Sequence, residues 1–128
     1  MKIHLIAGAR PNFMKIAPLY RHLSNQSDFD VKIVHTGQHY DASMSDYFFA
    51  DLDLPKPHHH LGTNTGTQAE QTGAVLVKYE RLCQDDRPEM SIVVGDVNST
   101  LACALTAAKL SIPVAHLESG LRSGSRAM

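Results

Sequence analysis

The sequence lacks the features that mark secreted or membrane-spanning proteins. It has only two cysteines among 128 residues, Cys83 and Cys103, and they form no CxxC pair. Both fall in segments that we expect to be helical, so they predict small buried side chains in a reducing compartment. The apolar run at the N-terminus is short and contains His4, which makes it too polar for a signal peptide or a membrane span. We therefore expect a cytoplasmic protein.

An excess of one charge is also missing. Lysine and arginine total 12 against 13 for aspartate and glutamate, which gives a net charge of -1. Without a long-range field of one sign, we expect no nucleic-acid partner and no membrane partner. The length and the 43% hydrophobic content suit one domain that folds around its own core.

Two common nucleotide-binding signatures are absent. The segment Gly8-Ala9-Arg10-Pro11-Asn12 carries Arg-Pro in the turn and does not match GxGxxG, and the chain has no GxxxxGK[ST] motif. A pyrophosphate within a nucleotide sugar stays open as a ligand. Glycine in this turn lets the backbone approach a ligand closely, and the start of a helix favours an anion.

Hydrophobic periodicity predicts alternating strands and helices. We expect strands at 2–8, 30–36, 91–96 and 113–117, and helices at 10–25, 67–84 and 100–110. Asn98 or Ser99 should cap the last of these helices. We assign no regular structure to 41–66. A short helix at SDYFFADLDL stays open, and PKPHHHLGTNTG, which is rich in turn-forming residues, is expected to be a long surface loop. This order of elements is typical of an α/β protein with a parallel sheet and helices on both faces.

Polar residues follow every predicted strand. In open parallel sheets ligands bind beyond the carboxyl ends of the strands, and these ends share one edge. The candidate residues at this edge are Arg10, Lys15, Gln38, His39, Asp96 and Glu118.

Each candidate also has a plainer interpretation. Arg10 and Lys15 could belong to an ordinary solvated helix start. Asp96 could form a turn or a helix cap. Glu118 ends an apolar strand, where a carboxylate needs a partner or a task, and an ion pair with Arg122 is the simpler of these alternatives.

The histidines do not predict a metal site. We expect His116, within the last strand, to be a hydrogen-bonded core histidine rather than a ligand. Three consecutive histidines, His58, His59 and His60, point in different directions and lack a fixed frame. We therefore expect them to lie in a solvated loop.

Four segments carry a family resemblance. GARPNFMKIAPL, HTGQHYD, VVGDVNSTLACALTAAKL and HLESGLRS resemble, in order and spacing, the N-terminal half of the non-hydrolysing UDP-N-acetylglucosamine (UDP-GlcNAc) 2-epimerases. The resemblance covers essentially the whole chain. It implies a Rossmann-like domain at 1–128, which would be the first of two domains facing one cleft, as in glycosyltransferases of the B type.

The resemblance also implies a reaction and roles for the candidate residues. The family inverts carbon 2 of the sugar by removing its proton while UDP leaves, and then adds UDP back with the proton on the opposite face. The product, UDP-ManNAc, serves cell-surface polysaccharide biosynthesis, and neither metal nor nicotinamide is required. By motif position, Asp96 and Glu118 resemble the family's catalytic acids, and Arg10 and Lys15 its diphosphate and active-site cations. Gln38 and His39 match a segment that lines an activator site in some bacterial members.

The family pattern continues beyond this chain with a Pro-Glu-Glu stretch and a second, UDP-binding domain, whereas the sequence ends at Met128. We expect the chain alone to be inactive or nearly so, because a nucleotide sugar held on one side stays open to water. Uncovered apolar surface predicts self-association into a homo-oligomer. A stand-alone UDP-sugar-binding module, a subunit completed by a separate chain and a glycosyltransferase of the same fold stay open as alternatives.

Overall fold

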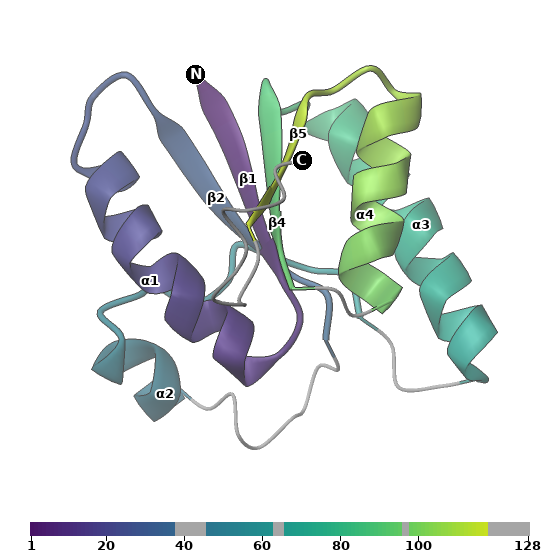
Figure 1. Ribbon diagram of the computed structural model, residues 1–128, viewed down its shortest axis with the longest axis horizontal. Helices are drawn as coiled ribbons and strands as arrows, with labels where there is room; N and C mark the ends of the chain where they lie inside the picture. Colours follow the sequence, from purple (N-terminus) through teal and green to yellow (C-terminus); the bar gives the residue numbers. More distant parts are fainter. Residues whose placement is uncertain (38–45, 63–65, 96–97, 118–128) are drawn as a thin grey trace, which may run out of the picture.

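A parallel sheet forms the centre of the molecule (Figure 1). The computed structural model describes residues 1–37, 46–62, 66–95 and 98–117. Within these ranges five parallel strands form a single sheet in the order β3-β2-β1-β4-β5. The strands are β1 (Lys2–Ala7), β2 (Asp30–His35), β3 (His59–His60), β4 (Met90–Val94) and β5 (Val114–Leu117).

Helices cover both faces of the sheet. The helices of the described residues are α1 (Arg10–Ser24), α2 (Asp46–Asp51), α3 (Gln68–Asp85) and α4 (Asn98–Lys109). Figure 1 shows α1 on one side of the sheet and α3 and α4 together on the other. This arrangement confirms the expected α/β class with a Rossmann-like parallel sheet.

Alternation along the strands divides the core into two layers. Successive side chains of a strand point to opposite faces, so Leu5 packs on the α1 side and Ile6 on the α3 and α4 side. Val93 and Val94 repeat this division on β4. Strand β4 lies between β1 and β5, and its near-continuous apolar run is typical of such a central strand.

The structure places two short elements in 41–66. Helix α2 lies in the stretch where a short helix was left open, whereas strand β3 lies where we expected a loop. Helix α2 lies there because Phe48 and Phe49 pack edge-on against Phe13 of α1, with ring centroids 6.5 and 5.3 Å apart. Strand β3 lies there because its two residues pair in register with Val34 and His35 of β2. Both elements depend on long-range contacts, which local periodicity does not reveal.

Two of the three consecutive histidines, His59 and His60, are therefore not in a loop, whereas His58 is exposed and precedes the strand. The backbone N–H of His58 donates to the Ile33 carbonyl, and the Ile33 N–H donates to Nδ1 of His58, each over 2.8 Å. His59 and His60 form β3 itself. Pairing with the edge of β2 thus orders a segment whose composition favours a loop.

The expected cap of α4 was also wrong. The helix begins at Asn98, so Asn98 and Ser99 lie inside its first turn. The Ser99 hydroxyl bonds Thr36 Oγ1 at the end of β2 over 2.9 Å. Ser99 therefore connects α4 to the sheet.

Both cysteines are buried and unbonded, as predicted. Cys83 of α3 is 1% exposed and Cys103 of α4 is fully buried. Burial raises the pKa of both thiols, which keeps them in the unreactive thiol form. No helix within the described ranges is long and apolar enough to cross a membrane.

Candidate functional site

The strand order places a switch point at the centre of the sheet. From β1 the chain passes to β2 on one side, whereas β4 is followed by β5 on the other. Ligands of open α/β sheets bind at the carboxyl ends of the strands where the order reverses in this way. The segments that follow β1 and β4 are therefore the first place to look for a ligand site.

The turn between β1 and α1 is built to start a helix without an acidic residue. Ala9 is extended, and Pro11 occupies the first turn, where a missing N–H costs nothing. The side chain of Asn12 accepts a hydrogen bond from the Ala9 N–H over 3.1 Å. Because the first turn holds no carboxylate, the positive end of the helix dipole is left for an anionic ligand.

Arg10 and Lys15 are the two predicted site residues that fall within the described residues. Both side chains are exposed, in the first two turns of α1. The guanidinium carbon of Arg10 lies 4.8 Å from the ring centroid of Phe48 in α2, a cation–π contact. This contact holds Arg10 against α2 and distinguishes it from an ordinary solvated residue at a helix start.

The other four predicted residues, Gln38, His39, Asp96 and Glu118, lie outside the described residues. The structure does describe Gly95 and Leu117, which directly precede Asp96 and Glu118 in the sequence. The Gly95 N–H donates to the carbonyl of Leu117 over 3.3 Å. The ends of β4 and β5 therefore meet at this edge, as the sequence predicted for the segments that carry the two acids.

His116 is not the core histidine that we expected. It is exposed on β5, and its Nε2 lies 2.7 Å from the carbonyl oxygen of Gly95. Strand β5 lies at the edge of the sheet, and each of its four residues is exposed. The apolar pattern of the strand suggested burial, but in the described residues only β4 flanks it.

Sequence reasoning missed the residues that support this edge. Asn12 and His35 are 6% and 3% exposed, and Nδ1 of His35 accepts the N–H of Gly37 over 2.9 Å. The ring of His35 also packs against Phe13 at 5.0 Å. Their places in the sequence could have indicated this role, because both polar residues lie close to the end of a predicted strand.

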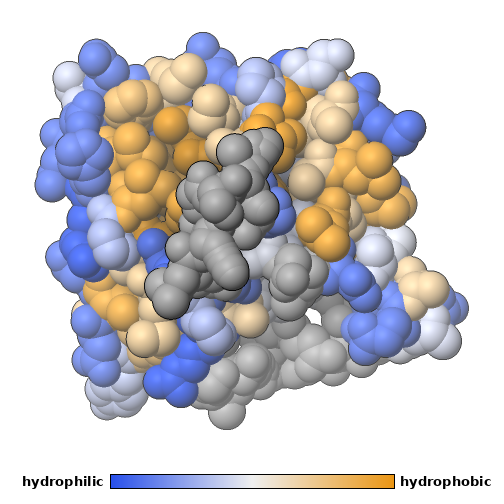
Figure 2. Space-filling view, in the orientation of Figure 1, coloured by the Kyte–Doolittle hydropathy of each residue, from blue (hydrophilic) through white to orange (hydrophobic). Residues whose placement is uncertain are grey.

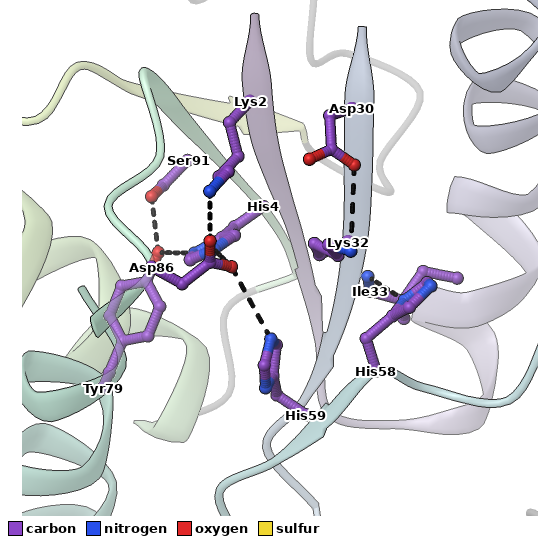
Figure 3. Close-up of polar contacts among 10 residues, drawn as sticks. All are labelled: Lys2, His4, Asp30, Lys32, Ile33, His58, His59, Tyr79, Asp86 and Ser91. Carbon is purple, nitrogen blue, oxygen red and sulfur yellow. Dashed lines mark hydrogen bonds and ion pairs between the residues drawn. The ribbon is translucent and has the colours of Figure 1, made fainter. Parts of the chain in front are cut away.

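A second group of polar side chains lies toward the amino ends of the strands (Figure 3). The Tyr79 hydroxyl lies 2.9 Å from His4 Nδ1 and 2.6 Å from Ser91 Oγ. On the other side of the imidazole, His4 Nε2 lies 3.5 Å from Asp86 Oδ2. Lys2 donates to the second oxygen of Asp86.

Shifted pKa values often mark functional sites, and this group has several. Burial lowers the pKa of His4 to about 4 and raises the pKa of Tyr79. The Lys2 ammonium holds the pKa of Asp86 below its usual value. However, His4, Tyr79 and Ser91 are all fully buried, so a substrate has no access to them. The group is a structural network, and in the part of the chain that the structure describes no set of side chains is arranged to hold a metal ion.

The fold and the edge described above define a class of protein, an α/β domain with a Rossmann-like parallel sheet whose strand order reverses at a central switch point. The chain belongs to the UDP-N-acetylglucosamine 2-epimerase family, whose sequence model matches residues 21–128. This match confirms the family indicated by the four motifs.

Named relatives agree with this assignment. The UDP-N-acetylglucosamine 2-epimerase of Methanocaldococcus jannaschii is 44% identical over all 128 residues. A UDP-2,3-diacetamido-2,3-dideoxy-D-glucuronate 2-epimerase of Pseudomonas aeruginosa is 46% identical over 123 residues, which are 96% of this chain. The chain spans about 35% of the length of both relatives.

A solved structure shows the same fold. The crystal structure of the M. jannaschii UDP-GlcNAc 2-epimerase in complex with UDP-GlcNAc and UDP matches with a TM-score of 0.83 at 43% sequence identity. The match covers all of this chain and 35% of the other.

Proposed function

We propose that residues 1–128 are the N-terminal, nucleotide-sugar-binding domain of an isomerase that interconverts UDP-GlcNAc and UDP-ManNAc. The observation that carries this proposal is the family match over residues 21–128, joined to a helix start at the switch point that favours an anion. In this proposal a second, UDP-binding domain completes the site, and the product serves cell-surface polysaccharide biosynthesis in the cytoplasm.

The proposed reaction is an elimination followed by an addition. A carboxylate removes the proton from carbon 2 while the bond between carbon 1 and the diphosphate oxygen breaks, and UDP leaves with the bonding electrons. The sugar is left with a double bond between carbons 1 and 2. UDP then adds back to carbon 1 while carbon 2 takes a proton on the opposite face. No hydride is transferred, so this chemistry calls for no nicotinamide.

Cations near the start of α1 would hold the diphosphate while it is separated from the sugar. The exposed side chains of Arg10 and Lys15 supply positive charge there, and the dipole of α1 adds to it. The contact with Phe48 restricts the guanidinium of Arg10 before a ligand arrives, which lowers the entropy cost of binding. Lys15 is proposed as the cation nearest the reacting atoms.

Two carboxylates would transfer the proton at carbon 2. We assign these roles to Asp96 and Glu118, which follow Gly95 and Leu117 in the sequence. The hydrogen bond between Gly95 and Leu117 supports the pairing, because it joins the strand ends that precede the two acids. Gln38 and His39 are proposed to contact a nucleotide sugar, at the substrate site or at a separate activator site.

Deuterium exchange at carbon 2 tests this proposal. UDP-GlcNAc is incubated in heavy water with the 128-residue chain, alone and together with the remaining part of a family member, and carbon 2 is followed by NMR. We expect little or no exchange with the chain alone, and exchange when the remaining part is added. Asp96→Asn and Glu118→Gln should each abolish it. Exchange that persists in both variants would contradict the assigned roles.

Binding without turnover is the main alternative, and the same samples distinguish it. A UDP-sugar-binding module would show ligand-induced shifts in the chain but no exchange under either condition. Transfer of the sugar to an added acceptor, without exchange at carbon 2, would instead indicate a glycosyltransferase.

A second substrate is favoured by one observation. The P. aeruginosa relative, named for UDP-2,3-diacetamido-2,3-dideoxy-D-glucuronate, is as similar to this chain as the M. jannaschii relative named for UDP-GlcNAc. The two sugars differ in their groups at carbons 3 and 6. Running the exchange assay with both nucleotide sugars separates the two candidates.

We also propose that the protein self-associates. A groove of about 590 Å³ lies between the first halves of α3 and α4, and Leu101 and Leu105 beside it are 43% and 51% exposed. Figure 2 shows apolar residues on the right of the molecule, where Figure 1 places these helices, and a further apolar area on its left. Contiguous apolar surface of this kind is typical of protein interfaces.

A further inference from the structure

Gly95 is enclosed on the side that faces α1. It follows β4 directly and has a φ of +85°, a conformation that favours glycine. A Cβ atom at this position would lie 2.5 Å from Nδ2 of Asn12 and 3.1 Å from its Cγ. The amide group of Asn12 therefore lies directly against the backbone of Gly95.

The carbonyl group of Gly95 is held from the other side by β5. Nε2 of His116 lies 2.7 Å from this oxygen, and because a carbonyl only accepts, Nε2 must carry the hydrogen. His116 lies beside Val93 in the register of the sheet, so its side chain reaches along the end of β4. Asn12 and His116 thus hold Gly95 from two different elements.

We propose that Asn12 and His116 are positioning residues that fix the backbone of Gly95, the residue directly before Asp96 in the sequence, relative to the start of α1. The oxygen that His116 holds belongs to the carbonyl group of Gly95. Asn12 relates Gly95 to the turn that carries Arg10, because its side chain lies against Gly95 and accepts the Ala9 N–H. This inference rests on the proposed function for the roles of Arg10 and Asp96.

The two contacts of Asn12 can be separated by substitution. Its Oδ1 stabilises the start of α1, whereas its Nδ2 packs against Gly95. Asn12→Asp keeps the acceptor for Ala9 and places a charged oxygen against Gly95. Asn12→Ala removes both contacts. A residue that only stabilised the helix start would tolerate aspartate, because a carboxylate at this third helical position also accepts the Ala9 N–H and its charge suits the helix dipole.

NMR of the labelled 128-residue chain provides the test. In His116→Ala the carbonyl carbon signal of Gly95 and the amide signal of residue 96 should move, because the hydrogen bond is lost. His116→Gln supplies an amide donor and should return both signals toward the wild-type positions. Signals of the buried His4 and Tyr79 serve as a control, since they should stay in place if the fold is intact. A Gly95 carbonyl signal that is unchanged in His116→Ala would show that His116 does not hold this carbonyl group, and would overturn the proposal.

Ligand titration in the same samples tests the functional half of the inference. We expect UDP-GlcNAc to bind about fivefold more weakly to His116→Ala and to Asn12→Asp, the effect of losing roughly one hydrogen bond. His116→Gln should restore most of the affinity. Wild-type affinity in both Asn12→Asp and His116→Ala would overturn the positioning role. If UDP-GlcNAc binds neither the wild-type chain nor the chain with the remaining part of a family member added, the proposed function is contradicted. The Gly95 signal then decides by itself whether His116 holds this carbonyl group.

Discussion

At the scale of single residues, His4 shows how an ionisable group is accommodated in the core. Its imidazole is fully buried, and burial lowers its pKa from an ordinary value of 6.5 to about 4 in spite of the nearby Asp86 carboxylate. Lys2 and His59 add positive charge near it, which opposes protonation further. The folded protein therefore holds His4 neutral at pH values where the unfolded chain binds a proton.

This difference predicts a pH-dependent stability. The contribution of a neutral His4 is fully present above pH 6.5 and is lost as the pH falls toward 4, because the unfolded state binds the proton first. The largest loss is of the order of 3 kcal/mol. We expect the free energy of unfolding, measured in urea at pH 7 and 4.5, to fall less in His4→Gln than in wild type.

The pH range and a matched variant isolate the effect of His4. Asp86 has a lowered pKa, so its own contribution is lost only as the pH falls below its ordinary value of 3.8. His22→Gln, at an exposed position of α1, provides the control and should behave as wild type. An equal pH dependence in wild type and His4→Gln would exclude His4 as the cause.

Tyr79 gives a second prediction at this scale. Nε2 of His4 faces the Asp86 carboxylate and must carry the hydrogen, because a lone pair there would be repelled. Nδ1 therefore accepts from the Tyr79 hydroxyl, which in turn accepts from Ser91. Tyr79→Phe should lower the free energy of unfolding by roughly 1 to 3 kcal/mol, because two buried groups lose their partner. Tyr47→Phe, at a side chain that is 84% exposed, should change it by less than about 0.5 kcal/mol. Equal effects of the two variants would show that the buried Tyr79 hydroxyl does not stabilise the core.

At the scale of elements, prediction from sequence succeeded where an element is defined by its own residues. The strands around Leu5, Ile33 and Val93 and the helices that carry Phe13 and Val75 all have periodicities that local reading detects. Helix α2 was left open and strand β3 was missed, because both form through contacts with α1 and β2. The parallel sheet predicted which edge carries the candidate site residues. The supporting side chains of Asn12 and His35 were not predicted, because their partners lie on other elements or segments.

Helix α2 nevertheless has a predicted effect on the proposed site. Two neighbouring residues of α2 have different contacts. Phe48 provides the ring beneath Arg10, and Phe49 packs against Phe13 of α1. Phe48→Leu keeps an apolar side chain but removes the cation–π contact, so UDP-GlcNAc should bind about two- to fivefold more weakly. Phe49→Leu removes the neighbouring ring and should affect stability more than affinity. Isothermal titration and urea unfolding measure the two quantities, and equal affinity losses would show that Arg10 does not depend on the ring of Phe48.

At the scale of the whole molecule, the helix layers on the two faces of the sheet differ in how much apolar surface they leave exposed. On one face the aromatic side chains of α1 and α2 are buried against each other. On the other, α3 and α4 pack on the sheet but leave leucines and an apolar groove on their outer surface. The chain also spans about 35% of the length of its relatives. An outer surface of this kind offers a place where another polypeptide can pack.

Charge placed on this outer surface should separate self-association from the fold. Leu105 is 51% exposed beside the groove, and a carboxylate buried there in an assembly would lack a partner. We expect the apparent mass of the wild-type chain in sedimentation equilibrium to rise with concentration, and that of Leu105→Glu to stay at the monomer value. Met14→Glu is the matched control, because Met14 is similarly exposed, at 55%, but lies on α1 at the opposite face of the sheet. It should associate as wild type does. A wild-type chain that stays monomeric at high concentration would show that another partner, or none, covers α3 and α4. Association that is weakened equally by Leu105→Glu and Met14→Glu would place the interface elsewhere.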